Sequence, residues 1–77
     1  MKTITYKVGD IILKIDPQQS PVEYTYHIIT EIGECNCITK NIEEPNTLMM
    51  FSLSGYLKDE NKLQINSHCE YYYYPAK

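Results

Sequence analysis

The chain contains no arginine and no tryptophan, and it has a single phenylalanine. All seven basic residues are lysines, and they stand among ten acidic residues, which gives a formal net charge of −3. Proteins that hold nucleic acid usually neutralise phosphates with clustered cations, and arginine is favoured for the bidentate contacts. The composition therefore disfavours direct nucleic-acid binding and fits a partner that is itself basic, such as a protein that normally holds nucleic acid.

Long apolar runs are also missing. No stretch of eighteen apolar residues is present that could span a membrane, and residues 1–10 hold no uninterrupted apolar segment that could form the core of a secretory signal. We therefore expect a cytoplasmic protein without a membrane partner. A chain of 77 residues is long enough for one small domain with a compact core, which we expect to comprise residues 1–77.

Residues 63–74 show the clearest pattern in the chain, because at period two they separate into two chemically different faces. Such alternation is typical of a β-strand with one face on a core and the other in solvent. The face expected to point inward comprises Leu63, Ile65, Ser67, Cys69, Tyr71 and Tyr73. The face expected to point outward comprises Gln64, Asn66, His68, Glu70, Tyr72 and Tyr74.

Residues 22–32 form the second-clearest strand. The even positions suit an inner face and are Val22, Tyr24, Tyr26, Ile28 and Ile32. The residues expected to face water are Glu23, Thr25, His27 and Glu31. Gly33-Glu34 can then close a two-residue hairpin into residues 35–40, because glycine readily adopts the positive φ that such turns require.

The remaining strands are shorter. Residues 2–8 alternate and end at Gly9-Asp10, a turn or bulge signal, and residues 11–15 are nearly all apolar before the loop that starts at Asp16-Pro17. Residues 49–53 place Met49, Phe51 and Leu53 on one side. No segment has a convincing helical apolar stripe. The sequence therefore predicts an all-β fold, a small antiparallel barrel or two-layer sheet of five to six strands.

The segment 6–12, with Gly9-Asp10 before Ile11, resembles the opening of many SH3-like barrels, which favours that form of the fold. Together with Asp16-Pro17 it is distantly similar to the start of the MazF-type endoribonuclease toxins, which are SH3-like and dimeric. The resemblance thus implies a barrel and leaves a homodimer open. The catalytic chemistry of those toxins depends on arginine, which this chain lacks, so ribonuclease activity is not expected.

Three cysteines and two histidines are the candidates for metal or catalytic chemistry. Cys35, Cys37, His68 and Cys69 could supply a zinc site, but adjacent residues of a strand point to opposite faces, so His68 and Cys69 should diverge. We therefore predict no metal and no other cofactor, and reduced cysteines that behave as small hydrophobes. Neither His27 nor His68 stands in a recognisable nucleophile motif, so we predict that the protein is not an enzyme.

Eight tyrosines are the remaining unusual feature. Tyrosine supplies contact area at low entropic cost and keeps a polar tip, which suits a binding surface. The predicted protein-binding residues are His68, Glu70, Tyr72 and Tyr74.

Two classes of function follow from these observations. The first is a non-enzymatic protein-binding module, of the kind that a phage or mobile element could use as a small acidic inhibitor of a host nucleic-acid-binding protein. The second is a degenerate MazF-like barrel that targets RNA.

Overall fold

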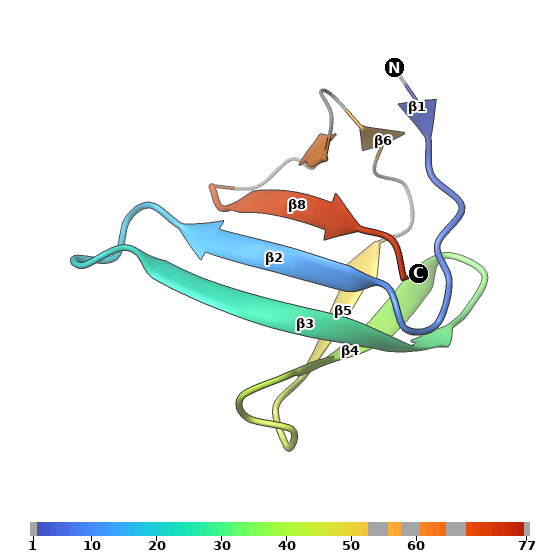
Figure 1. The fold of residues 1–77 in the computed structure, drawn as a ribbon, viewed down its shortest axis with the longest axis horizontal. Helices are drawn as coiled ribbons and strands as arrows, with labels where there is room; N and C mark the ends of the chain where they lie inside the picture. The colour runs from blue at the N-terminus through green and yellow to red at the C-terminus, as the bar shows by residue number, and fades with distance from the viewer. Residues whose placement is uncertain (1, 53–55, 58–60, 65–67, 77) are drawn as a thin grey trace.

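In the computed structural model, residues 2–52, 56–57, 61–64 and 68–76 are described, and their strands form one antiparallel sheet. The strands are β1 (Lys2–Thr3), β2 (Ile11–Asp16), β3 (Glu23–Ile32), β4 (Asn36–Asn41), β5 (Leu48–Ser52), β6 (Tyr56–Leu57), β7 (Lys62–Gln64) and β8 (Glu70–Tyr74). Their order across the sheet is β1-β6-β7-β8-β2-β3-β4-β5 (Figure 1). None of these residues is helical, which confirms the all-β prediction.

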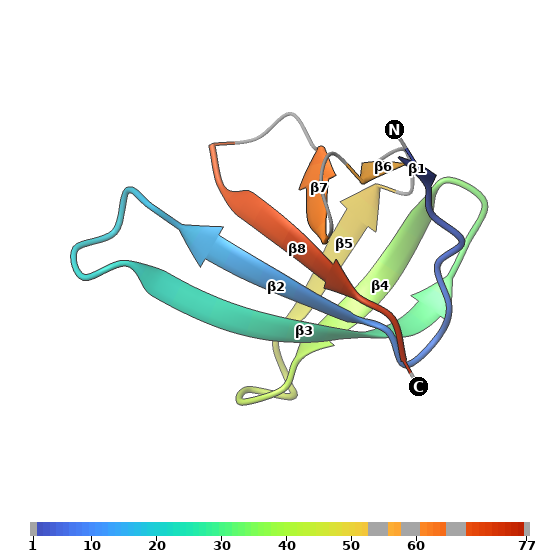
Figure 2. The same cartoon turned by 45° about the horizontal axis from the view of Figure 1, so that its top comes forward.

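The sheet bends over itself but does not close into a barrel. β8, β2 and β3 lie side by side, and β4 and β5 cross behind them (Figures 1 and 2). This arrangement is compatible with the two-layer form of the prediction. Within the described part of the chain, six strands have three or more residues, in agreement with the predicted five to six, and β1 and β6 add a two-residue pairing.

The core lies on the concave side of the bent sheet. Its buried side chains are Ile12, Ile29, Cys37, Phe51, Leu63 and Tyr73. Met49 also packs against this core, so the face predicted for residues 49–53 is confirmed at Met49 and Phe51, while Leu53 lies outside the described residues. Tyr71 meets Phe51 edge to face, with ring centroids 5.4 Å apart.

The hairpin between β3 and β4 confirms one predicted pairing and corrects its turn. Ile32 pairs with Cys37, the backbone N–H of Gly33 donates to the carbonyl of Asn36, and residues 33–35 connect the two strands, three residues instead of two. Among the described residues, only Gly9 has a positive φ, so Gly33 does not use the left-handed conformation that we predicted. A register shift at Thr30, between Ile29 and Glu31, bends β3 near this end.

The faces predicted for residues 22–32 are wrong before the register shift at Thr30, whereas Glu31, beyond the shift, is exposed as predicted. His27 is only 2% exposed and Ile29 only 1%, whereas Tyr24 and Tyr26 are 61% and 46% exposed. Before the register shift the even positions therefore point away from the core, whereas Ile32, beyond the shift, pairs with the buried Cys37. The pattern gave the wrong faces because tyrosine occurs both in cores and on surfaces, and because histidine was assigned to the solvent face.

Residues 63–74 do not form one strand. They contribute to two antiparallel strands, in which Lys62 pairs with Tyr72 and Leu63 with Tyr71. Paired residues point to the same face, and here they are an even number of positions apart in the sequence. The alternation of the two strands therefore reads as one continuous period-two pattern across the turn. Leu63 and Tyr73 are buried as predicted. The faces predicted for 65–67, and the side chain of Gln64, lie outside the described part.

The turn before β2 was predicted from two adjacent residues, Gly9 and Asp10. Gly9 has a φ of 98°, and the N–H of Asp10 donates to the carbonyl of Lys7, so Gly9-Asp10 is a turn as predicted. The first strand is shorter than the predicted 2–8, although Ile4 and Tyr6 still pack against the core.

Candidate binding surface

The convex side of the three central strands carries rows of apolar and aromatic side chains. Residues that pair directly across a sheet point to the same face, so the register defines each row. The first row is Tyr74, Ile11 and Ile28, the second is Tyr72, Leu13 and Tyr26, and the third is Glu70, Ile15 and Tyr24. We call these nine residues the tyrosine face.

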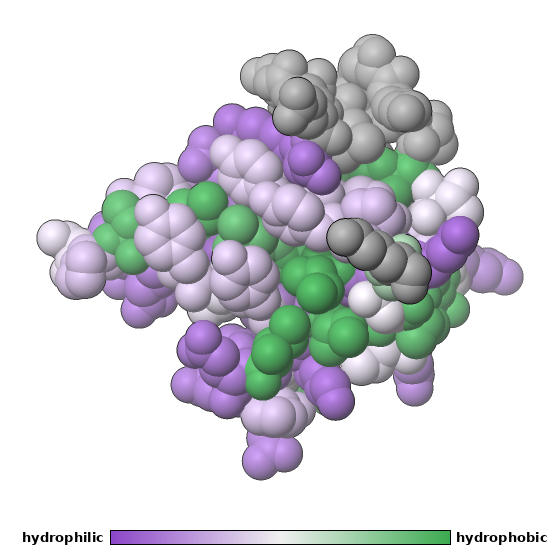
Figure 3. All heavy atoms as spheres, viewed as in Figure 1, coloured by the Kyte–Doolittle hydropathy of each residue, from purple (hydrophilic) through white to green (hydrophobic). Residues whose placement is uncertain are grey.

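Four of the nine side chains are tyrosines, and three of these are well exposed. Tyr74 is 42% exposed, and Tyr24 and Tyr26 are more so, while Tyr72 is half-buried. Leu13 is buried although it points away from the core, which fits its position between Tyr26 and Tyr72 in the middle row. Figure 3 shows hydrophobic atoms in green and aromatic rings in pale purple gathered over β2, β3 and β8.

Three of the four predicted site residues meet on this face. Glu70, Tyr72 and Tyr74 are alternate residues of β8, and each pairs with an apolar residue of β2. His68 is exposed as predicted but lies before β8, beside Asp16. The alternation of β2 places Asp16 on the opposite side of the sheet from Ile15, so the structure does not place His68 on the tyrosine face.

Sequence reasoning missed Tyr24, Tyr26 and the β2 residues of this face. One signal was available in residues 11–15, which are apolar except at Lys14, because adjacent apolar residues in a strand place apolar side chains on both sides of its sheet. Since β2 contacts the core through Ile12, its odd positions had to form a second apolar surface.

Charges are few on and beside this face. Glu70 forms an ion pair with Lys62, with 3.0 Å between Nζ and Oε1, and both side chains are partly exposed. An exposed pair of this kind contributes little to stability, about 0–1 kcal/mol. The exposed Lys40, which pairs with Ile28, extends the first row onto β4.

His27, on the core side, is a second group of chemical interest. Its Nε2 lies 2.8 Å from the hydroxyl oxygen of Thr25, and its ring meets Phe51 with centroids 5.9 Å apart. The Nδ1 atom is buried and has no hydrogen-bond partner among the described residues. Burial, and secondarily the charge of Lys14, lower the pKa of His27 below its usual value, so the core favours the neutral ring. The prediction that His27 faces solvent is therefore wrong.

Asp10 is the most buried carboxylate in the described part of the chain, with 1% exposure. Its oxygens accept hydrogen bonds from the backbone N–H groups of Lys7 and Ala76 and from the hydroxyl of Tyr73. These donors come from both ends of the chain. The group therefore serves as a structural clamp between the turn before β2 and the segment after β8.

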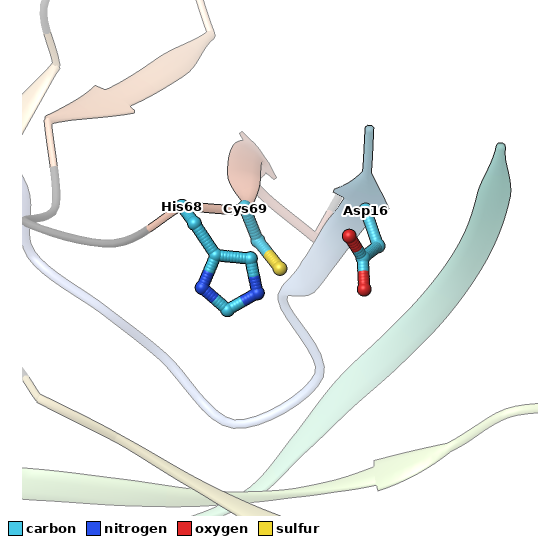
Figure 4. A group of neighbouring side chains, drawn as sticks. All are labelled: Asp16, His68 and Cys69. Atoms are coloured by element: carbon cyan, nitrogen blue, oxygen red, sulfur yellow. The ribbon is translucent and has the colours of Figure 1, made fainter. Parts of the chain in front are cut away.

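Two of the three cysteines, Cys37 and Cys69, are buried as predicted for small hydrophobes, and Cys35 is not. Cys35 is exposed in the β3–β4 loop, and Cys37 is buried in the core, where desolvation raises the pKa of its thiol. His68 and Cys69 lie in a bend before β8, so the rule that adjacent strand residues diverge does not apply to them. Together with Asp16 they form a group whose ligand atoms all lie within 4.8 Å of one another (Figure 4). The reason that we gave for excluding a metal is therefore wrong.

Comparisons with protein-family models, curated proteins and solved structures find no match to this chain. In the described part, there is no helix of the length and apolarity that a membrane crossing needs. The proposed function therefore rests on the properties of the tyrosine face.

Proposed function

We propose that this chain is a non-enzymatic protein-binding module and that the tyrosine face is its contact surface. The observation that carries the proposal is a sheet face on which three aliphatic residues of β2 lie between β3 and β8, with tyrosine at four of the six flanking positions and on both sides of Leu13. Aromatic residues around an apolar centre are the composition that dominates binding energy at protein interfaces. A broad sheet face also suits a partner surface better than it suits a small substrate, which needs a concave site.

The partner that fits this surface best is a basic protein. The net charge of −3 favours the approach of a positively charged partner. At closer range, tyrosine rings attract arginine and lysine side chains through cation–π interactions, and their hydroxyl groups can hydrogen-bond to the same partner. A host protein that binds nucleic acid presents arginine and lysine side chains of this kind on its surface. In this proposal, the protein is a small cytoplasmic inhibitor encoded by a phage or mobile element, and its SH3-like origin stays a prediction.

RNA is the alternative occupant, because exposed aromatic rings also stack on single-stranded bases. Such sites combine the stacking residues with a positively charged groove that follows the phosphates. The described cations beside the tyrosine face are Lys40 and Lys62, and Lys62 is already paired with Glu70. The charge distribution therefore favours a protein partner over RNA.

The test is an affinity capture from host lysate after nuclease treatment, with three baits compared in parallel. The first bait is the unmodified protein, and the second carries Tyr26→Ser, which removes an exposed ring from the middle row. The third carries Met50→Ser as a matched control, because Met50 is 66% exposed on β5, outside the tyrosine face. Circular dichroism of the three baits checks that each is folded.

The proposal expects a basic protein that is retained by the first and third baits and lost from the second. Equal retention by all three baits would mean that the tyrosine face is not the contact surface. A gel shift with single-stranded RNA supplies the other decisive result. Binding that weakens steeply with salt and is lost in Tyr26→Ser would assign the face to RNA and overturn the proposal.

A further inference from the structure

A second site lies on the opposite side of the sheet, where β2 ends and β8 begins. Ile15 pairs with Glu70, so the next position outward brings Asp16, the last residue of β2, next to Cys69. Asp16 is half-buried, His68 is exposed and Cys69 is buried. In Figure 4 the carboxylate, the imidazole and the thiol are directed into the same space.

The three side chains offer one sulfur, one nitrogen and one oxygen ligand, and these atoms lie within 4.8 Å of one another. Zinc binds these three ligand types at about 2.0–2.3 Å, so ligands on one tetrahedral ion are about 3.5 Å apart. Only a small inward movement is needed to reach that spacing, and the exposed ring of His68 is free of core packing that would oppose it. We propose that Asp16, His68 and Cys69 bind a zinc ion.

The surroundings of Asp16 support this assignment. The backbone N–H of Gln18 donates to Oδ1 of Asp16 at 3.0 Å, which orients the carboxylate. Ligating carboxylates are characteristically held by such outer hydrogen bonds. Glu23 pairs with Asp16 across the sheet and so provides a neighbouring carboxylate, while water can complete the four-coordinate shell. On binding, the thiol of Cys69 loses its proton to the buffer, and the sulfur coordinates as thiolate.

A zinc ion at this position would connect the start of β8 to the end of β2. The ion binds only where the three residues are brought together by folding, so its binding free energy adds to the stability of the folded state. The consequence is a melting temperature that rises with zinc concentration and returns to its starting value when a chelator is added.

Cobalt(II) is the probe for the test, because it occupies zinc sites and gives a thiolate-to-metal charge-transfer absorption when sulfur is a ligand. Untagged, reduced protein is first freed of metal with a chelator and then titrated with cobalt. The proposal expects absorption that saturates at one equivalent and is displaced by zinc. Absence of saturable absorption would overturn it.

Five variants locate the site. Cys69→Ser should abolish the charge-transfer absorption, and Cys35→Ser, which removes an exposed thiol in the β3–β4 loop, should leave it unchanged. Cys69 is buried and its replacement can weaken the fold, so His68→Ala is the second test. Because His68 is exposed, this variant should keep its circular dichroism spectrum while its cobalt affinity falls at least tenfold.

The carboxylate is tested by Asp16→Asn against Glu31→Gln, which changes an exposed carboxylate at the other end of β3. Asp16→Asn should weaken cobalt binding and Glu31→Gln should not. Absorption that survives Cys69→Ser, or an affinity that is unchanged in both His68→Ala and Asp16→Asn, would place the metal elsewhere and overturn the proposal.

Discussion

The hydroxyl of Tyr73 donates a hydrogen bond to the carboxylate of Asp10, which stands 63 positions earlier in the chain. The same carboxylate accepts hydrogen bonds from the backbone of Lys7 and Ala76, each at 2.8 Å. Tyr6 packs edge to face on Tyr73, with ring centroids 5.3 Å apart. Both ends of the chain are therefore held at one buried carboxylate, which makes Tyr73 a stability determinant.

Replacement of Tyr73 by phenylalanine tests this relationship. The variant keeps the ring but removes the hydroxyl donor, so the buried carboxylate of Asp10 loses a partner. We expect the free energy of unfolding to fall by about 1–3 kcal/mol, as for other buried groups that lose a hydrogen bond. Urea denaturation followed by circular dichroism measures the loss.

Tyr6→Phe is the matched control for that measurement. The hydroxyl of Tyr6 is buried and has no hydrogen-bond partner among the described residues. Its removal should therefore leave stability unchanged or increase it slightly. If Tyr6→Phe and Tyr73→Phe lose the same stability, the hydrogen bond to Asp10 cannot be the cause.

Alkaline pH should destabilise the protein through the same pair. Burial raises the pKa of Tyr6 from 10.0 to about 12, with a smaller contribution from Cys37. Burial and then the hydrogen bond to Asp10 also raise the pKa of Tyr73. Above pH 10 the unfolded chain loses these protons while the folded protein retains them, so stability is complete below pH 10 and falls between pH 10 and 12. Urea midpoints across this range measure the slope.

In Tyr6→Phe the fall between pH 10 and 12 should be smaller, because one of the two buried phenols is gone. The remaining slope comes from Tyr73. A pH dependence identical to that of the unmodified protein would show that Tyr6 ionises in the folded state as easily as in the unfolded chain.

Acid should destabilise the protein through His27. Burial and Lys14 lower the pKa of this residue in the folded protein. Below pH 6.5 the unfolded chain therefore takes up a proton before the folded protein does, and stability falls as the pH decreases through the lowered pKa. We expect His27→Gln, measured in the presence of a chelator, to show a smaller loss between pH 7 and pH 5 than the unmodified protein.

His68→Gln is the control for the acid prediction, because His68 is exposed and lies outside the core. It should keep the full loss of stability between pH 7 and pH 5. If His27→Gln loses as much stability between pH 7 and pH 5 as the unmodified protein, carboxylates and not His27 cause the loss.

The sequence predicted the strands better than their orientation. The hairpin from β3 to β4 and the turn at Gly9 follow from local signals, and the structure confirms both elements. The faces predicted for the first part of β3 were wrong because tyrosine and histidine occur both in cores and on surfaces. Which face of the strand is buried depends on a contact distant in the sequence, that of His27 with Phe51. Only the pairing of β3 with β2 shows which of its faces is buried.

The candidate sites likewise contain residues that a local pattern predicted and residues that only strand pairing brings together. Glu70, Tyr72 and Tyr74 were predicted together because they alternate within one strand. Tyr24 and Tyr26 join them through pairing with β2, which no local pattern specifies. The approach of His68 and Cys69 to Asp16 depends on where β8 begins, and the unbroken alternation in the sequence concealed that boundary.

The most direct test of the proposed function is a calorimetric titration of the captured partner, once purified, against the unmodified protein, Tyr26→Ser and Met50→Ser. Truncation of a central interface aromatic costs about 2 kcal/mol or more, which is about thirtyfold in Kd. Tyr26→Ser should therefore weaken binding at least thirtyfold with its fold retained. Met50→Ser should bind within about twofold of the unmodified protein, because this substitution removes no contact at the interface. Equal affinities for all three proteins would contradict the assignment of the tyrosine face as the binding surface.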